Sequence, residues 1–212
     1  MSRKIKVWGR LTSSNVKKVL WVAHDLKIDI DRVEAGGKHG VVETPEYKAL
    51  NPNSRVPTIE DGDFVLWESN SIMRYFCEKF GGEALYPADP QARADINRWL
   101  DWMLSVLVPA DAKLFISTMR VPEAQHDRAA IAKMVGAAAR AYDIMNKRLD
   151  GRKYIVGERL SLADIAFSVH ADRWLRNPFL QEKPDFPNNT AWLDRVRGNH
   201  EGFRKFVEIP LE

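Results

Sequence analysis

Residues 51–71 read NPNSRVPTIEDGDFVLWESNS. Two short runs of strand-forming residues flank an Asp-Gly turn, which is a strong local signal for a β-hairpin. Pro57 conflicts with this hairpin, because it stands one place into the first strand and a proline has no N–H group for the sheet. A conflict between a local rule and the surrounding pattern often marks a functional position, so Pro57 is a candidate functional residue.

Two interpretations of Pro57 are open from this stretch alone. Pro57 is either an ordinary edge-strand proline or the second residue of a cis Val56–Pro57 bond, an isomer adopted by about 5–6% of X–Pro bonds in folded proteins. A cis bond here would turn the backbone N–H and C=O groups of Val56 outward. These groups would then pair with an extended, peptide-like ligand as a strand pairs with its neighbour.

The residues after the hairpin, Glu68 and Ser69, open a predicted helix that ends at Gly81-Gly82. Its apolar residues recur at helical spacing, at Ile72, Tyr75, Phe76 and Phe80. A helix N-terminus with a serine hydroxyl suits a ligand carboxylate, and the Glu68 carboxylate suits an ammonium group. The alternative is that Glu68 and Ser69 form an ordinary helix start.

The composition is typical of a soluble globular protein, with 45% hydrophobic and 29% charged residues. The 212 residues provide for one large domain or two small ones. A net charge of +3 without blocks of like charge gives no indication of nucleic-acid binding. The N-terminus has no apolar signal region, and no apolar run approaches a bilayer span, so we expect a cytoplasmic protein without membrane or nucleic-acid partners.

The counts of cysteine and histidine argue against thiol redox chemistry and against a metal site. Cys77 is the single cysteine, which excludes an internal disulfide and any Cys-x-x-Cys redox or zinc motif. The five histidines show no spacing typical of metal ligands. We therefore expect no bound metal.

The N-terminal third alternates between strand and helix patterns. Residues 5–8 predict a strand, a helix begins near Asn15, and residues 28–33 predict a second strand. A right-handed crossover makes these two strands parallel, and residues 34–50 form a loop with one short helix. Together with the hairpin and the helix that follows it, the order is βαβ and then ββα, which is the thioredoxin-like layout.

The loop before the first helix carries two hydroxyl groups, those of Ser13 and Ser14, followed by Asn15. One serine is expected to cap the helix. The other is a candidate donor to a thiolate, because such a hydrogen bond would lower the thiol pKa from its ordinary value of about 8.5. Lys17 and Lys18 follow in the first turn, and we interpret them as part of a solvated face rather than as an anion-binding pair.

The second half of the chain shows only helical patterns after the linker LYPADP at residues 85–90. A long helix is predicted over residues 91–119, with a kink or interruption at Pro109, and another over residues 123–149. Ser161 and Asp164 then form a capping box that starts a structural core helix over residues 161–174.

These motifs resemble a known family, the cytosolic glutathione transferases. Four motifs resemble the N-terminal domain of that family, namely Ser13-x-Asn15-x-x-Lys18, Asn51-Pro52, Val56-Pro57 and Glu68-Ser69. The tract from Trp8 to Lys18 is most similar to the bacterial serine-type members, near the theta class. The Ser161–Asp164 motif resembles the buried capping motif of the family's helical domain.

The resemblance implies a glutathione transferase fold, with an α+β thioredoxin-like domain in residues 1–82 and an all-α domain in residues 88–212. It also implies a homodimer that uses glutathione as co-substrate. The cysteinyl backbone would pair with Val56 before a cis Pro57, and the γ-glutamyl carboxylate would bind Glu68 and Ser69. Ser13 would carry the catalytic hydroxyl, although the alignment leaves a one-place slip to Ser14 open.

Three further residues are implied as contacts of glutathione or of its thiol. Asn15 matches an asparagine that faces the thiol in some bacterial members, and Arg55 would assist at the rim of the site. His39 lies in a variable loop where some relatives contact glutathione, and the alternative is a solvent-exposed loop histidine.

The implied activity is attack of the glutathione thiolate on a small electrophile, bound between residues 10–11 and the first long helix of the second domain. The loop has no cysteine or tyrosine, which argues against the cysteine-type and tyrosine-type classes. The alternatives are a glutathione-dependent isomerase or dehalogenase, a disulfide reductase that uses two glutathiones through Asn15, and a non-catalytic interaction module of this fold.

Overall fold

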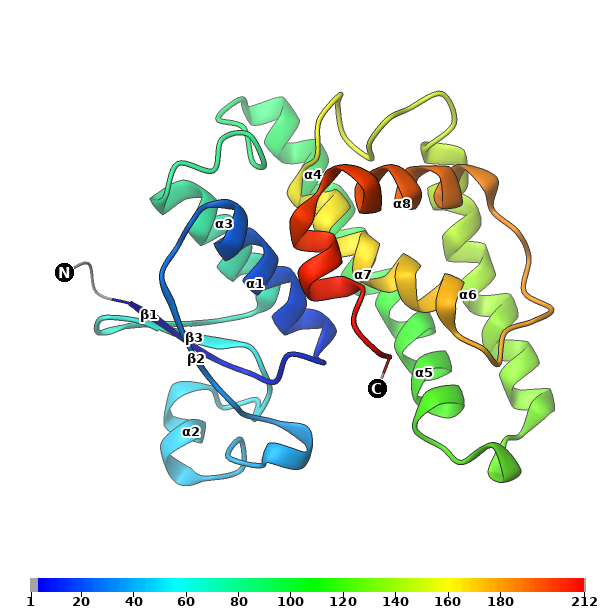
Figure 1. Ribbon diagram of the computed structural model, residues 1–212, viewed down its shortest axis with the longest axis horizontal. Coiled ribbons are helices and arrows are strands. Elements are labelled where there is room, and N and C mark those ends of the chain that lie inside the picture. Colours follow the sequence, from blue (N-terminus) through cyan, green and yellow to red (C-terminus); the bar gives the residue numbers. More distant parts are fainter. Residues whose placement is uncertain (1–3, 212) are drawn as a thin grey trace.

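Four short strands form the sheet of the N-terminal domain in the computed structural model, which describes residues 4–211 (Figure 1). They are β1 (Ile5–Trp8), β2 (Ile30–Val33), β3 (Thr58–Asp61) and β4 (Phe64–Trp67). β1 pairs in parallel with β2 and antiparallel with β3, and β3 pairs antiparallel with β4, so the spatial order is β2-β1-β3-β4. The predicted parallel pair is confirmed, although β2 begins at Ile30 rather than at residue 28.

Two helices, α1 (Ser14–Asp25) and α3 (Ser69–Lys79), lie side by side on one face of this sheet, and α2 (Pro45–Leu50) lies on the other (Figure 1). The apolar residues of α1 recur three and four places apart, so one side of the helix packs against the sheet and α3. A 3₁₀ turn at Gly37–His39 precedes α2. The predicted thioredoxin-like layout is confirmed.

The hairpin turns through Gly62 and Asp63, and Gly62 adopts a φ of 71°, which a glycine takes without strain. Its first strand begins at Thr58, which pairs with Trp8 on one side and Trp67 on the other. Pro57 therefore lies immediately before the strand and removes no donor from the sheet, so the prediction that it stands inside the strand is wrong by one place. The Val56–Pro57 bond is cis.

The second domain consists of helices. They are α4 (Pro90–Trp102), α5 (Val108–Met119), α6 (Arg128–Arg148), α7 (Leu162–Arg176) and α8 (Pro187–Asn199). α4 and α5 are joined by a π-helical turn at Met103–Leu107, so the interruption of the predicted long helix precedes Pro109, which lies in the first turn of α5. α6 begins at Arg128 rather than at residue 123, because the Asp127 carboxylate caps it by accepting the Ala130 N–H group.

The continuous helical stretch of α4 and α5, residues 90–119, is long and apolar enough to cross a bilayer when judged by length and composition only. The sequence analysis expected no segment of that length and hydropathy. A third of the most apolar 18-residue window is buried inside the protein. Core helices of soluble proteins pass the same test, so this stretch is weak evidence of membrane insertion.

The start of α7 is organised by the buried carboxylate of Asp164. It accepts hydrogen bonds from the backbone N–H and the hydroxyl of Ser161, from the Ile155 N–H and from the Trp192 indole N–H, at 2.7–2.9 Å. Burial raises the pKa of Asp164, and these donors oppose that shift. The predicted capping box is present. Asp164 additionally links the loop before α7 and helix α8 to the N-terminus of α7.

Lys17 and Lys18 are buried, which contradicts their interpretation as a solvated face. Only 3% of Lys17 and 0% of Lys18 is exposed, because α7 of the second domain packs over α1. The Lys17 ammonium donates to the Val207 carbonyl at 3.3 Å, and the Lys18 ammonium donates to Asn70 Oδ1 at 3.1 Å. Burial lowers the pKa of Lys18 to about 7, against the attraction of the Glu68 carboxylate.

Removing the Asp164 carboxylate is expected to destabilise the fold strongly. Asp164→Ala leaves the Ser161, Ile155 and Trp192 donors without their acceptor, and each unpaired buried donor costs about 1–3 kcal/mol. Ser161→Ala should cost about 0.5–2 kcal/mol. Denaturant unfolding measures both losses.

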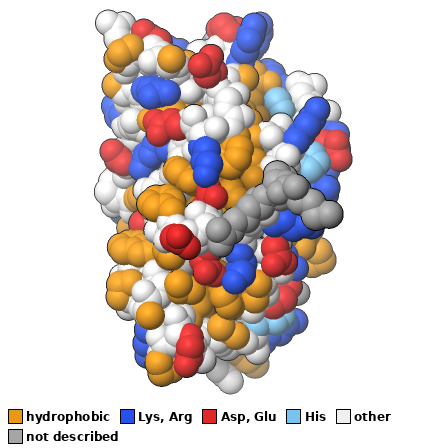
Figure 2. All heavy atoms as spheres, turned by 90° about the vertical axis from the view of Figure 1, so that its left-hand side faces the viewer, with side chains coloured by type: hydrophobic (Ala, Val, Ile, Leu, Met, Phe, Trp, Pro, Cys, Tyr) orange, Lys and Arg blue, Asp and Glu red, His pale blue; other side chains and the backbone are white. Residues whose placement is uncertain are grey.

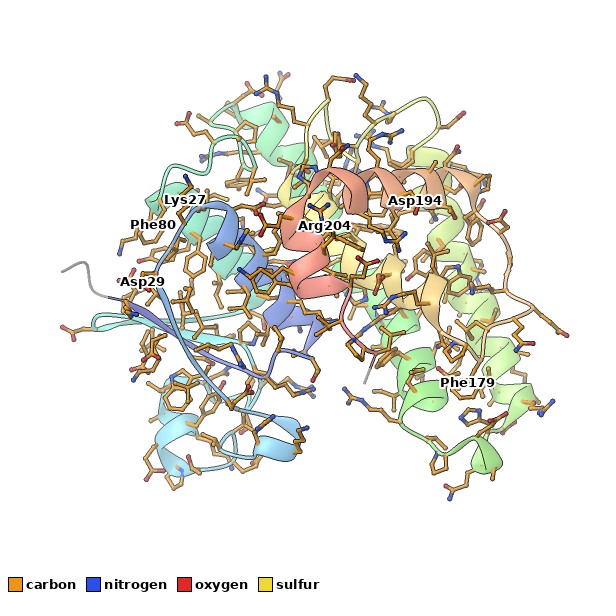
Figure 3. The ribbon with its side chains drawn as sticks, viewed as in Figure 1. Lys27, Asp29, Phe80, Phe179, Asp194 and Arg204 are labelled. Carbon is orange, nitrogen blue, oxygen red and sulfur yellow. The ribbon has the colours of Figure 1, made fainter. Side chains whose placement is uncertain are left out.

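The matched control is Asp194→Ala, an exposed aspartate on α8 (Figure 3). It should change the free energy of unfolding by less than about 0.5 kcal/mol. A wild-type stability for Asp164→Ala would contradict the assigned role of the carboxylate.

The buried Lys18 makes stability depend on pH. Its pKa falls from 10.5 in the unfolded chain to about 7 in the folded protein. The unfolded chain therefore binds more protons between these values, and folding stability rises with pH in that window. Lys18→Met removes this contribution, so from pH 6.5 to pH 9 the wild type should gain about 2 kcal/mol relative to the variant.

Urea unfolding at the two pH values measures this difference. Lys27→Met, at an exposed lysine after the same helix (Figure 3), should show no such change with pH. An equal gain for the Lys18 variant and the wild type would show that the Lys18 ammonium is solvated.

Candidate functional site

A cavity of about 370 Å³ lies between the two domains and contains most of the residues that the sequence singled out. The N-terminal domain contributes the loop after β1 with Ser13–Asn15, the Gly36–Gly37 turn, and residues 54–56 before Pro57. The helical domain contributes α5, through Ala112, Phe115, Ile116 and the adjoining Arg120, and α7, through Arg173. The site is therefore built from segments of both domains.

Ser13 lies at the N-cap position of α1 and lines the cavity, with 9% of its surface exposed. Its hydroxyl makes no capping hydrogen bond within residues 4–211. Ser14 is the first residue of the helix and also lines the cavity. The expectation that one of these two hydroxyls caps α1 is therefore wrong, and the Ser13 hydroxyl remains available to a ligand.

A hydrogen bond joins the two helix N-termini at the site. The Ser69 hydroxyl donates to Asn15 Oδ1 at 3.3 Å, so the start of α3 and the start of α1 are held together. Ser69 is buried as the first residue of α3. Glu68 precedes it with a φ of 72°, a left-handed conformation that is strained for a non-glycine residue, and its side chain is exposed. Such strain is often found at functional positions.

The segment that leads to the cis bond is held by Tyr47 and Asn51. The Arg55 carbonyl accepts hydrogen bonds from the Tyr47 hydroxyl at 2.6 Å and from Asn51 Nδ2 at 2.9 Å. Asn51 Nδ2 also donates to Thr58 Oγ1 at 3.0 Å, and burial raises the pKa of Tyr47. These contacts fix the backbone on both sides of Val56, which lines the cavity. The sequence analysis did not identify Tyr47, since nothing in its local pattern marks it.

His39 is not among the residues that line the cavity. It lies in the 3₁₀ turn before α2, and its Nε2 is 3.5 Å from the Glu34 carboxylate, which also pairs with Arg32 at 2.7 Å. About a third of the His39 side chain is exposed. A contact between His39 and glutathione therefore stays a prediction.

The cavity is lined by four guanidinium groups and by no carboxylate among residues 4–211. They belong to Arg10, Arg55, Arg120 and Arg173. From the sequence, Arg55 was named as a glutathione contact and the loop of Arg10 as one wall of the electrophile site. Arg120 and Arg173 reach the cavity from the second domain, so no local motif connects them with residues 13–15.

Two other features of the described residues do not belong to this site. A larger cavity of about 600 Å³ lies between the first half of α6 and the segment after α7 that contains Phe179 (Figure 3), and none of the predicted site residues lines it. Within residues 4–211, no group of three or more His, Cys, Asp and Glu side chains is arranged to hold a metal ion.

Comparison with known proteins covers both domains. Two family models match, described as glutathione S-transferase, N-terminal domain, over residues 8–84, and glutathione S-transferase, C-terminal domain, over residues 98–199. Among curated proteins, the chain is similar to glutathione S-transferase GstB of Escherichia coli K12, with 31% identity over 98% of this chain and 99% of the relative. It also shares 30% identity with glutathione S-transferase D6 of Drosophila melanogaster, over 87% of this chain and 83% of that protein.

A solved structure is likewise similar to the chain over both domains. The theta class glutathione S-transferase from Xanthomonas axonopodis pv. citri, with glutathione bound, is 37% identical and aligns with a TM-score of 0.92. The alignment covers 98% of this chain and 99% of that structure. Because these similarities extend over both domains and almost the full length, the chain belongs to the glutathione S-transferase family.

Proposed function

We propose that this protein is a glutathione transferase in which Ser13 activates the thiol of bound glutathione for attack on a small electrophile. The observation that carries this proposal is the Ser13 hydroxyl, which lines the cavity and makes no bond to its own helix. A hydroxyl in that position donates to a thiolate more strongly than to a thiol, since a charged acceptor strengthens a hydrogen bond. It therefore lowers the thiol pKa and raises the thiolate fraction at neutral pH.

Glutathione fits the remaining polar groups of the site. The backbone of Val56, which lines the cavity beside the cis bond, would pair with the cysteinyl backbone, and Arg55 would assist at the rim. Ser69 at the N-terminus of α3, together with Glu68, would bind the γ-glutamyl end, because helix N-termini favour carboxylates and Glu68 favours the ammonium. Ser14 and His39 are secondary candidates, and His39 would have to leave Glu34.

The α1 N-terminus adds a field that favours negative charge near Ser13. The first N–H groups of a helix lack intrahelical acceptors and carry the positive end of the helix dipole. Asn15 uses its Oδ1 atom to accept from Ser69, which leaves its amide group to donate toward the thiol. Asn15 is therefore proposed as a second, weaker stabiliser of the thiolate.

A homodimer is proposed as the assembled form. Exposed apolar side chains occur on β4, at Phe64 and Trp67, and on the π-helical turn, at Leu104 and Val106. The face of the molecule on the N-terminal-domain side shows many apolar side chains interspersed with charged ones (Figure 2). A role in detoxification, a cytoplasmic location and the absence of membrane and nucleic-acid partners remain predictions from the composition and the family resemblance.

Glutathione should bind with one site per chain in a calorimetric titration. Ser69→Ala should weaken this binding by about tenfold, because it removes the hydroxyl that would turn from Asn15 Oδ1 to donate to the γ-glutamyl carboxylate. Thermal melting of the same samples verifies that the fold is intact. Failure of the folded wild type to bind millimolar glutathione would contradict the proposed function.

Ser13→Ala should lower turnover near neutral pH by about ten- to a thousand-fold, as for the loss of one preorganised donor. Glutathione affinity should stay within a few-fold, because Val56, Glu68 and Ser69 carry the binding. The deficit should shrink as the pH rises, since hydroxide then ionises the thiol without the serine. Steady-state kinetics from pH 6 to pH 9 measure these changes.

The matched controls are Ser14→Ala and Asn15→Ala. Ser14→Ala should have little effect on turnover, and Asn15→Ala should give an intermediate loss. If Ser14→Ala abolishes turnover while Ser13→Ala does not, the catalytic hydroxyl is Ser14. If neither serine matters and Asn15 does, the protein belongs to the disulfide-reducing alternative, which a small disulfide substrate would test.

A further inference from the structure

The helical-domain wall of the cavity presents two guanidinium groups that make no ion-pair contact with a carboxylate of residues 4–211. Arg173 is only 8% exposed, yet it lines the cavity from α7, and Arg120 lines it from the C-terminal end of α5. Among residues 4–211, no carboxylate lies within ion-pair distance of either group, and neither donates a hydrogen bond to a protein acceptor. Arg120 is exposed to solvent, whereas Arg173 is buried, and a buried cation without an ion-pair contact is unfavourable unless a ligand supplies negative charge.

The two carboxylates whose charge acts on Arg173 are bonded to other groups. Asp111 accepts from the Tyr142 hydroxyl at 3.1 Å on one oxygen and contacts His170 Nδ1 at 2.6 Å on the other. Asp172 binds Arg176 through both of its oxygens, at 2.8 and 2.6 Å. Both carboxylates attract the charge of Arg173, but neither makes an ion-pair contact with it, so its N–H groups are not used by an acceptor of the protein among residues 4–211.

The ring of Phe115 holds the two cations near each other. The Arg173 guanidinium lies 4.1 Å from the ring centroid, and the Arg120 guanidinium lies 6.0 Å from it. Both are within the range of cation–π attraction, which orients a guanidinium but leaves its N–H groups free to donate. Burial lowers the pKa of Arg173, the charge of Asp111 opposes that shift, and the nearby charge of Arg120 adds to it. Two such groups around one ring form a site for a single anionic group.

Glutathione does not require this pair of arginines. Its proposed contacts, Val56, Glu68 and Ser69, lie on the N-terminal domain, where Val56, Arg10 and Arg55 line the cavity and Ser69 is bonded to the cavity-lining Asn15. Arg120 and Arg173 face the cavity from the opposite domain. The helical-domain wall of the cavity, which these two arginines line, would therefore contact the second substrate.

We propose that Arg120 and Arg173 bind a carboxylate of the second substrate, so that the preferred electrophiles are small α-halo carboxylates. This rests on the proposed function. In the reaction, the thiolate sulfur forms a bond to the α-carbon while the carbon–halogen bond breaks, and the halide leaves with the electron pair of that bond. The bidentate fork of an arginine matches the two oxygens of a carboxylate. The anion contact thus places the α-carbon beside the sulfur.

The test compares iodoacetate with iodoacetamide, which have nearly the same shape and differ in charge. Each kcat/KM is divided by the uncatalysed rate constant with glutathione, which gives the acceleration by the enzyme. The wild type should accelerate iodoacetate at least tenfold more than iodoacetamide. Arg173→Gln should lower the ratio of the two accelerations by at least tenfold, and Arg120→Gln by several-fold. Arg173→Lys should retain part of the ratio, because it keeps the charge and loses the fork.

Arg152→Gln is the matched control, because Arg152 is an exposed arginine that does not line the cavity. This variant should leave the accelerations of iodoacetate and iodoacetamide unchanged. Binding of the two reaction products provides a readout without turnover. By calorimetry, S-carboxymethylglutathione should bind the wild type at least tenfold more tightly than S-carbamoylmethylglutathione, and Arg173→Gln should remove the difference. Thermal melting verifies the fold of each variant.

Several results would overturn the inference. An unchanged ratio in Arg173→Gln would exclude a contact with the electrophile. An equal loss with both reagents that shrinks at high pH would show that Arg173 acts on the thiolate instead. Turnover of iodoacetamide with no preference for iodoacetate would refute the inference alone, whereas no turnover of either reagent and no glutathione binding would refute the proposed function with it.

Discussion

The packing of α1 between the sheet and α7 is the contact on which the remaining structure depends. One side of α1 lies against α3 and the other against α7 and the π-helical turn at Phe203–Val207. Trp21 is completely buried there, and a Cβ atom on Gly202 would lie 2.0 Å from its ring, so only glycine permits this close approach. The same helix presents Ser13 at its N-terminus. Anchoring α1 on both sides therefore fixes the hydroxyl of Ser13, the proposed catalytic group, relative to the second domain.

Burial of charged groups follows from that packing. Because α7 covers α1, Lys18 loses its solvent and its ammonium depends on Asn70 at the start of α3. Arg173 on the same helix α7 lies beside Phe115 and faces the cavity. The packing of α7 on α1 thus contributes both to the stability of the two-domain arrangement and to the positive potential of the cavity. A substitution at this interface would affect both properties.

Features governed by short-range rules could be predicted well from the sequence. The parallel pair of β1 and β2, the β3–β4 hairpin and the capping box of Ser161 and Asp164 each depend on residues that are near in the chain or on a connection rule with few exceptions. Pro57 was found through its conflict with the hairpin. Where boundaries shifted, the cause was local hydrogen bonding, as in the Asp127 cap that delays α6 to Arg128.

The sequence by itself therefore determined the order of elements, the capping of the core helix and the group of residues around the cis Pro57 that resembles a glutathione site. Tertiary structure alone decided that Lys17 and Lys18 are buried, that His39 pairs with Glu34, and that arginines of the second domain reach the cavity. The reason is physical: burial and pairing of a charged side chain depend on elements far away in the chain. Local spacing places a residue on a helix face but does not identify what packs against that face.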